Sequence, residues 1–234
     1  ILFEGYYQLN MSNPPRVTNV STVEEALEKC GSRHFDMIIV MSRLGQGGHV
    51  ELSKALKKAA PRTPIYLLLN DNVEVGALDR RRQELQRNYD QVFVWNGTPE
   101  VFMAIVKFME DRSNVENDTS VGLTRVILLV EDSIRYYSRY LPILYSELLK
   151  QTTRLAKDHG ADGMSRTLAM RVRPKVLLAT TYEEAIAFAE RYQDFLLCVI
   201  TDRKYPKDGA LDREAGIKLI KAVKDRNPYL PTTH

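Results

Sequence analysis

Two apolar runs in this chain end directly in carboxylate side chains. Residues 126–130 (VILLV) lead into Glu131 and Asp132, and residues 198–201 (CVIT) lead into Asp202. In an open parallel sheet, functional groups gather at the carboxyl ends of the strands, so we expect these carboxylates to lie together. Three negative charges in one place repel one another unless a hard cation lies among them. Mg²⁺ suits such a site because it binds one or two carboxylates together with phosphate and water oxygens.

A carboxylate beside bound Mg²⁺ can act as a nucleophile and carry a phosphoryl group as an aspartyl-phosphate. We therefore expect Asp202 to accept a phosphoryl group. The alternative is that Asp202 is a structural acid that caps the loop at residues 204–209. Arg203 and Lys204 follow it directly, and a basic side chain in the cluster, such as Lys204 paired with Asp132, would leave the site inactive.

Length and composition indicate an ordinary globular protein. The chain has 234 residues, which corresponds to one or two domains, and 44% of them are apolar, enough to build a core. The formal net charge of +3 is nearly balanced and the basic residues are scattered, which argues against nucleic acid as the main partner. Cys30 and Cys198 are too few for a disulfide framework, so we expect a reduced, cytoplasmic protein.

The apolar segments and the chain ends bear on membranes and processing. No apolar stretch approaches the length that spans a membrane, and the chain lacks a charged-then-apolar leader. We therefore expect no membrane partner. The sequence starts and stops abruptly, so we expect it to be a fragment of a longer protein.

Short apolar runs alternate with amphipathic helical patterns, which is typical of βαβ units and a parallel sheet. The expected strands are residues 16–20, 37–41, 65–69, 91–95, 125–130, 175–180 and 195–201. The expected helices are residues 23–30, 49–59, 75–88, 99–111, 134–155, 182–191 and 212–225. The polar segment 112–124 lacks periodicity and is interpreted as a linker between two α/β domains, 1–111 and 125–234.

An internal repeat supports two copies of one unit. The stretch VSTVEEA at residues 20–26 resembles ATTYEEA at residues 179–185. Each is a strand end, a threonine suited to cap a helix, and a Glu-Glu-Ala helix start, and each is followed by another apolar strand.

The second half resembles the receiver domain of two-component response regulators, which has a flavodoxin-like (βα)5 fold. Residues 128–133 (LLVEDS) are similar to the first strand and acidic pair of that family. Residues 199–209 (VITDRKYPKDG) are similar to its third strand, phosphoacceptor and following loop, with the proline four residues after the acceptor. The fold class we expect is therefore two flavodoxin-like receiver-type domains with parallel sheets, both truncated.

The resemblance implies specific roles for these residues. Asp202 would be phosphorylated by a histidine kinase or a phosphotransfer protein. Mg²⁺ would be held by Glu131, Asp132, Asp202 and the backbone carbonyl of Arg203. The domain would then regulate an output region of the same, longer protein, so we expect a regulatory phosphoacceptor and not an enzyme.

The second half departs from the family pattern in two places. Residues 150–174 extend the first helix and add a basic loop. Because the sequence stops soon after Pro231, we expect the domain to end before its fourth strand. The switch Thr or Ser and the lysine of the fifth strand are then outside the sequence.

The first half resembles a receiver from its second strand onward but lacks the residues that carry the chemistry. Met41 stands at the acceptor position, Leu69 at the switch hydroxyl position and Trp95 at the lysine position, while the first strand and its acidic pair are missing. We interpret residues 1–111 as a degenerate pseudo-receiver that acts through contact, with Trp95 as a candidate anchor.

The tandem arrangement is also similar to the N-terminal region of a narrower group. These are large bacterial proteins with a pyruvate phosphate dikinase-like, phosphoenolpyruvate/pyruvate-binding module. The sequence contains none of the dikinase chemistry itself.

Two other functions stay open. One is a phosphorylation-independent scaffold that forms a homodimer through an apolar stripe on helix 134–155, made of Ile134, Tyr137, Leu141, Leu144, Leu148 and Leu155. The other is a Mg²⁺-dependent hydrolase similar to the haloacid-dehalogenase-like phosphatases. Those carry D-x-D after the first strand, where this chain has Glu131-Asp132-Ser133, so the motif disfavours that function.

Overall fold

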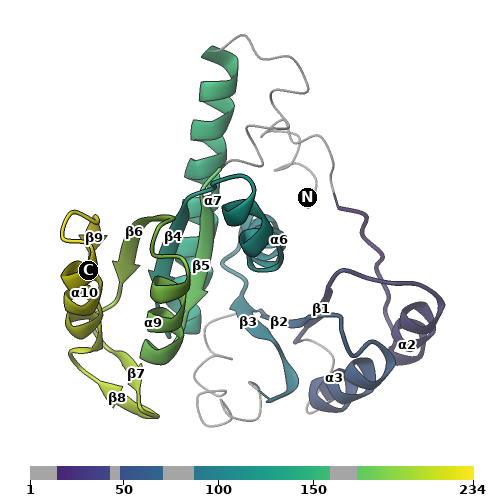
Figure 1. The fold of residues 1–234 in the computed structure, drawn as a ribbon. Helices are drawn as coiled ribbons and strands as arrows, with labels where there is room; N and C mark the ends of the chain where they lie inside the picture. Colours follow the sequence, from purple (N-terminus) through teal and green to yellow (C-terminus); the bar gives the residue numbers. More distant parts are fainter. Residues whose placement is uncertain (1–14, 43–47, 71–86, 159–172) are drawn as a thin grey trace. The chain divides into compact units, whose positions relative to one another are not determined.

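The computed structural model describes residues 15–42, 48–70, 87–158 and 173–234. Within these ranges the chain is an α/β protein with parallel sheets, as the sequence predicts, and it has six helices. It divides into two compact units, one containing the described residues up to Thr98 and the other those from Pro99 onward. Figure 1 shows the elements of both units.

The first unit holds a sheet of three parallel strands in the order β1-β2-β3. Its elements are α2 Val23–Ser32, β1 Ile38–Met41, α3 Gly48–Ala59, β2 Ile65–Leu69 and β3 Gln91–Val94. All five residues of β2 are buried, because β2 is the central strand of the three. α2 packs against α3.

Two expected elements of the first unit differ from the structure. The strand predicted at residues 16–20 is wrong, since residues 15–21 form neither helix nor strand. Residues 16–21 are exposed, so this run has no buried apolar face to dock on a sheet. The helix predicted at residues 75–88 lies outside the described residues except for its last two, which are helical.

The second unit holds a four-stranded parallel sheet in the order β5-β4-β6-β9 and a two-stranded antiparallel hairpin, β7-β8. Its helices are α6 Glu100–Ser120, α7 Ile134–Asp158, α9 Tyr182–Arg191 and α10 Ala215–Arg226. Its strands are β4 Val126–Val130, β5 Lys175–Ala179, β6 Leu196–Thr201, β7 Tyr205–Lys207, β8 Ala210–Asp212 and β9 Thr232–Thr233. Strand order reverses at β4, which lies between β5 on one side and β6 on the other.

Helices cover both faces of this sheet. Val126, Leu128 and Val130 of β4 form one buried cluster with residues of α9 and α10, such as Ala185 and Leu219. Figure 1 shows α7 on the opposite side of the strands from α9, and α6 packs against both α7 and β5. Every residue of the central strand β4 is consequently buried, and so is every residue of the edge strand β5, against which α6 packs.

The internal repeat of the sequence is also a repeat of local structure. The hydroxyl of Thr22 accepts a hydrogen bond from the backbone N–H of Glu25, and that of Thr181 accepts one from Glu184, both at 3.2 Å. Each glutamate carboxylate accepts a further bond from the backbone N–H that precedes the threonine, at 3.2 and 2.9 Å. These bonds satisfy amide donors at the helix start that have no partner within the helix.

Residues 112–124, expected as a linker, instead continue α6 as far as Ser120. Val115 and Thr119 are buried, at 5% and 3% exposure, and Val115 belongs to the core of the second unit. The prediction failed because a single buried apolar residue among many polar ones gives no visible helical period. The whole of α6 therefore belongs with the second unit.

A buried ion pair fixes α6 against the start of β5. The Asp111 carboxylate is fully buried and accepts hydrogen bonds from Nη1 and Nη2 of Arg173 at 3.1 and 2.6 Å. It also accepts one from the backbone N–H of Val176 at 2.8 Å. About two turns further along α6, Asp118 pairs with Lys175 at 2.6 Å. These contacts hold the two elements in one register.

The end of the chain corrects another expectation. β9 pairs in parallel with β6, Thr232 beside Val199 and Thr233 beside Ile200. The carbonyl of Pro231 already accepts a hydrogen bond from the N–H of Val199 at 3.0 Å. The prediction that the domain stops before its fourth strand is therefore wrong, because pairing begins directly after the proline.

The apolar stripe expected to form a homodimer is partly used inside the chain. Tyr137 and Leu141 are buried, at 3% and 0% exposure, so they face the core and not a second copy. In the part of α7 whose side chains are described, residues 134–154, the large exposed apolar side chains are Tyr136, Tyr140 and Ile143. The two tyrosine rings stack with centroids 6.1 Å apart. Among the described residues, no helix is long and apolar enough to cross a membrane.

Candidate functional site

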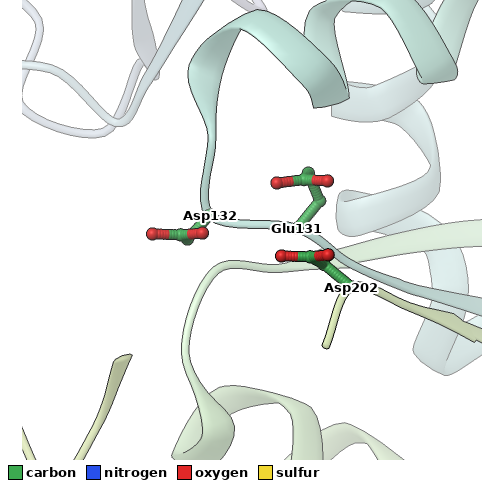
Figure 2. A group of neighbouring side chains, drawn as sticks. All are labelled: Glu131, Asp132 and Asp202. Atoms are coloured by element: carbon green, nitrogen blue, oxygen red, sulfur yellow. The ribbon is translucent and has the colours of Figure 1, made fainter. Parts of the chain in front are cut away.

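The three expected carboxylates meet at one edge of the second sheet. Glu131 and Asp132 follow β4 directly and Asp202 follows β6, as Figure 2 shows. The two strands are parallel neighbours, with Val130 beside Thr201 at their carboxyl ends. One carboxylate oxygen of each side chain lies within 4.8 Å of the other two. The prediction that these residues lie together is confirmed.

Glu131 is the buried member of this acidic cluster. It is 4% exposed, and its Oε1 accepts a hydrogen bond from the backbone N–H of Ser133 at 3.0 Å. Burial, with the charges of Asp202 and Asp132 acting in the same direction and the Ser133 bond against it, raises the pKa of Glu131 to about 7. Near neutral pH its carboxyl group is therefore divided between the protonated and ionised forms.

Asp132 is half-buried and Asp202 is exposed, so the cluster opens to solvent on the Asp202 side. The backbone N–H of Asp202 donates to the carbonyl of Val130 at 2.8 Å, which ties the residue to β4. Its Oδ2 accepts a hydrogen bond from the backbone N–H of Lys204 at 3.3 Å. Asp202 thus caps its own loop with one oxygen while keeping an accessible carboxylate.

The two basic residues after Asp202 do not neutralise the cluster in the described part of the chain. No ion pair there joins Arg203 or Lys204 to any of the three carboxylates. The carbonyl of Arg203, predicted as a metal ligand, accepts a hydrogen bond from the N–H of Gly216 at 3.1 Å. A carbonyl oxygen has a second lone pair, so its role as a ligand stays a prediction.

The donor set suits a hard divalent cation. Three carboxylates offer oxygen ligands of the type that Mg²⁺ prefers, and its metal–oxygen distance of about 2.0–2.1 Å places octahedral ligands roughly 3–4 Å apart. The spacing of up to 4.8 Å in the cluster therefore requires only a small side-chain movement. Besides burial, repulsion from Asp202 and Asp132 raises the pKa of Glu131. A bound cation would relieve this repulsion.

The described residues at the carboxyl edge of the first sheet form no such group of carboxylates. Met41 is exposed, Leu69 is buried and Trp95 is half-buried, and the N–H of Trp95 donates to the carbonyl of Leu69 at 2.8 Å. Beside them, Asn70 Nδ2 donates to Ser42 Oγ at 2.8 Å. Among the described residues, the only group of three metal-binding side chains is the one in the second unit.

The hairpin β7-β8 next to the acidic cluster was not predicted. Asp208 and Gly209 form its turn with φ of +52° and +77°, the left-handed conformation that two-residue hairpin turns require. Asp-Gly between short strands is a known sequence signal for such a turn. The resemblance to receiver domains predicts only a loop after Asp202, and each strand of the hairpin has only three residues.

Comparison with protein-family models, with curated proteins and with solved structures finds no match to this chain.

Proposed function

We propose that the second unit is a phosphoacceptor domain of the receiver type, in which Asp202 takes a phosphoryl group in the presence of Mg²⁺. The observation that carries this proposal is the meeting of Glu131, Asp132 and Asp202 at the carboxyl ends of β4 and β6. In open α/β sheets, ligands bind at the carboxyl edge where strand order reverses, which here is between these two strands.

The strand order supports the flavodoxin-like assignment. Numbered along the second unit, β5-β4-β6-β9 corresponds to 2-1-3-4, the first four strands of the flavodoxin-like order 2-1-3-4-5. In the first unit, β1-β2-β3 is compatible with the last three strands of the same order. We infer that this unit is a pseudo-receiver that acts through contact, because its carboxyl edge carries Met41, Leu69 and Trp95.

The accessible carboxylate of Asp202 is suited to nucleophilic attack. One of its oxygens would attack the phosphorus of a phosphohistidine on a kinase or phosphotransfer protein. The P–O bond forms as the P–N bond breaks, and the released imidazole takes a proton from solvent. Mg²⁺, when bound, neutralises charge on the phosphoryl oxygens. Glu131 and Asp132 would hold it, together with Asp202 and the Arg203 carbonyl.

Phosphorylation adds charge at the carboxyl edge of the sheet and would bias a nearby two-state element. We propose that the readout is an output region of a larger protein, such as a phosphoenolpyruvate/pyruvate-binding module.

The second candidate function is a phosphorylation-independent scaffold. The exposed side chains of Tyr136, Tyr140 and Ile143 favour the scaffold, because they form an apolar surface suited to contact with another protein.

The test is binding of Mg²⁺ with beryllofluoride, a mimic of a phosphoryl group, measured by calorimetry on the 234-residue chain. We expect Mg²⁺-dependent binding that is lost in Asp202→Ala, which removes the nucleophile. Asp225→Asn is the matched control, because Asp225 is an exposed acid of α10 outside the cluster. Absence of binding in the folded wild-type chain would reject the phosphoacceptor function and leave the scaffold.

A further inference from the structure

A pair of buried hydroxyl groups lies under the loop that carries Asp202. Thr201 is 3% exposed and Tyr205, the first residue of β7, is fully buried. Thr201 Oγ1 lies 2.8 Å from the backbone carbonyl oxygen of Asp202 and 3.2 Å from the hydroxyl oxygen of Tyr205. The three groups form a continuous hydrogen-bonded chain from the hairpin to the backbone of Asp202.

The direction of these hydrogen bonds follows from the number of protons. Thr201 has one hydroxyl proton, and the Asp202 carbonyl can only accept, so Thr201 donates to the carbonyl and Tyr205 donates to Thr201. Burial raises the pKa of Tyr205 to about 12, so its hydroxyl keeps the donor proton at neutral pH.

The other side of the Asp202 peptide is fixed by β4 and α10. The N–H of Asp202 donates to Val130, and the N–H of Gly216 at the start of α10 donates to the Arg203 carbonyl. The hairpin is in turn held by a hydrogen bond of 2.8 Å from the N–H of Asp208 to Glu183 of α9. The orientation of Asp202 thus depends on the buried hydroxyl groups of Thr201 and Tyr205. Tyr205 is itself held in place by the hairpin, which bonds to α9.

We infer that Tyr205 is a positioning residue for the Asp202 carboxylate, acting through Thr201. Its hydroxyl orients Thr201, and Thr201 fixes the peptide plane from which the Asp202 side chain departs. Loss of either hydroxyl lets that peptide rotate and widens the spacing of the acidic cluster. The inference deepens the proposed function. Its predicted effect on Mg²⁺ binding rests on that function, whereas the positioning of Asp202 does not.

The experiment removes single oxygen atoms from the full chain and measures the affinity for Mg²⁺ by calorimetry. We expect Tyr205→Phe and Thr201→Val each to weaken Mg²⁺ binding about 3- to 10-fold, which is the scale of one hydrogen bond. Thr201→Ser restores the hydroxyl and should restore the affinity. The double variant Thr201→Val with Tyr205→Phe should bind no more weakly than Thr201→Val, because the two hydroxyls act in series.

Tyr192→Phe is the matched control for loss of a tyrosine hydroxyl. Tyr192 is buried in the same unit, and its hydroxyl bonds Glu116 of α6 at 3.3 Å, away from the cluster. A Tyr205→Phe variant with the Mg²⁺ affinity of this control and of wild type would overturn the inference.

A second measurement keeps the inference separate from the proposed function. Hydrogen exchange of the Asp202 amide, followed by NMR, reports how firmly residue 202 is held, through its hydrogen bond to Val130, without any metal. We expect faster exchange in Tyr205→Phe and Thr201→Val but not in Tyr192→Phe. If the wild type binds no Mg²⁺, the proposed function fails while this exchange result still decides the positioning role. Unchanged exchange in both variants would reject it.

Discussion

Glu131 places an ionisable group in an environment that disfavours its charge. Its side chain is buried, the N–H of Ser133 donates a hydrogen bond to it, and two further carboxylates lie beside it. The folded protein therefore favours the protonated form of Glu131 more than the unfolded chain does. The direction of this preference sets the pH dependence of both stability and metal binding.

We predict that Glu131→Gln removes a pH-dependent loss of stability. The pKa is about 7 in the folded state and near its ordinary value of 4.5 in the unfolded chain. Between these values the folded state holds more protons, so the free energy of unfolding falls as pH rises through this window. The total fall is on the order of 3 kcal/mol, from 1.4 kcal/mol per pKa unit. Denaturant titrations at several pH values, without divalent cations, measure it.

The comparison that decides this prediction is the difference between wild type and Glu131→Gln at each pH. Groups that do not interact with Glu131 titrate equally in both proteins and cancel. A difference that stays constant from pH 4.5 to 7 would contradict the assigned shift.

The wild type should also bind Mg²⁺ more weakly as pH falls below 7, because the proton and the cation compete for the Glu131 carboxylate.

At the scale of elements, α10 approaches the loop after β6 at a glycine. A Cβ at Gly216 would lie 2.1 Å from the carbonyl oxygen of Asp202 and 3.0 Å from Cα of Arg203. Both neighbours are backbone atoms, which cannot move aside as a flexible side chain would. The start of the helix and the acidic loop can share this space only without a side chain.

We predict that Gly216→Ala is destabilising and weakens Mg²⁺ binding, because α10 must shift away from the Asp202 loop. The expected loss of stability is about 1–3 kcal/mol, as for other overpacked sites. Gly31→Ala in α2 is the control, since a Cβ there meets no atom within 4 Å. That control should be neutral or slightly stabilising. Thermal unfolding and calorimetry measure the two effects, and equal behaviour of both variants would contradict the prediction.

The contact between α6 and β5 depends on a charge that water does not reach. We predict that Asp111→Ala costs about 3–5 kcal/mol, because it leaves the Arg173 guanidinium buried without its partner. Glu190→Ala, which breaks the exposed pair with Arg226, should cost less than about 1 kcal/mol. Replacing both partners by apolar residues, Asp111→Leu with Arg173→Met, should recover much of the loss. Failure of the double variant to recover would argue against an uncompensated charge as the cause.

At the scale of the whole molecule, the chain contains two units with separate sheets. We predict two unfolding transitions in calorimetry, with only one sensitive to Mg²⁺. Mg²⁺ at 100 times its Kd should stabilise the second unit by about 2.7 kcal/mol. Trp95 is the only tryptophan of the chain and lies in the first unit, so its fluorescence should report the transition that Mg²⁺ leaves unchanged. A Mg²⁺-dependent shift of the fluorescence transition would contradict this assignment.

The sequence was sufficient for the features that depend on local pattern. Strand Ile65–Leu69 and helix Tyr182–Arg191 were predicted with their observed bounds, and the adjacency of Glu131 and Asp202 followed from parallel strands. Burial of Glu131, the ion pair of Asp111 and the hydroxyl of Tyr205 depend on partners far away in the chain. No period or spacing in one sequence encodes those contacts, so they became visible only in three dimensions.

The pairing of β4 with β6 has a consequence for the time at which the cluster forms during synthesis. Residues 132 and 202 are 70 positions apart (202 − 132), so the first carboxylates leave the ribosome well before the last. At about 5–20 residues per second, this interval lasts several seconds. Throughout it Glu131 is surrounded by water and ionised at neutral pH. The pairing of β6 with β4 then brings Asp202 beside Glu131, and the raised pKa of Glu131 makes the folding domain take up part of a proton at neutral pH.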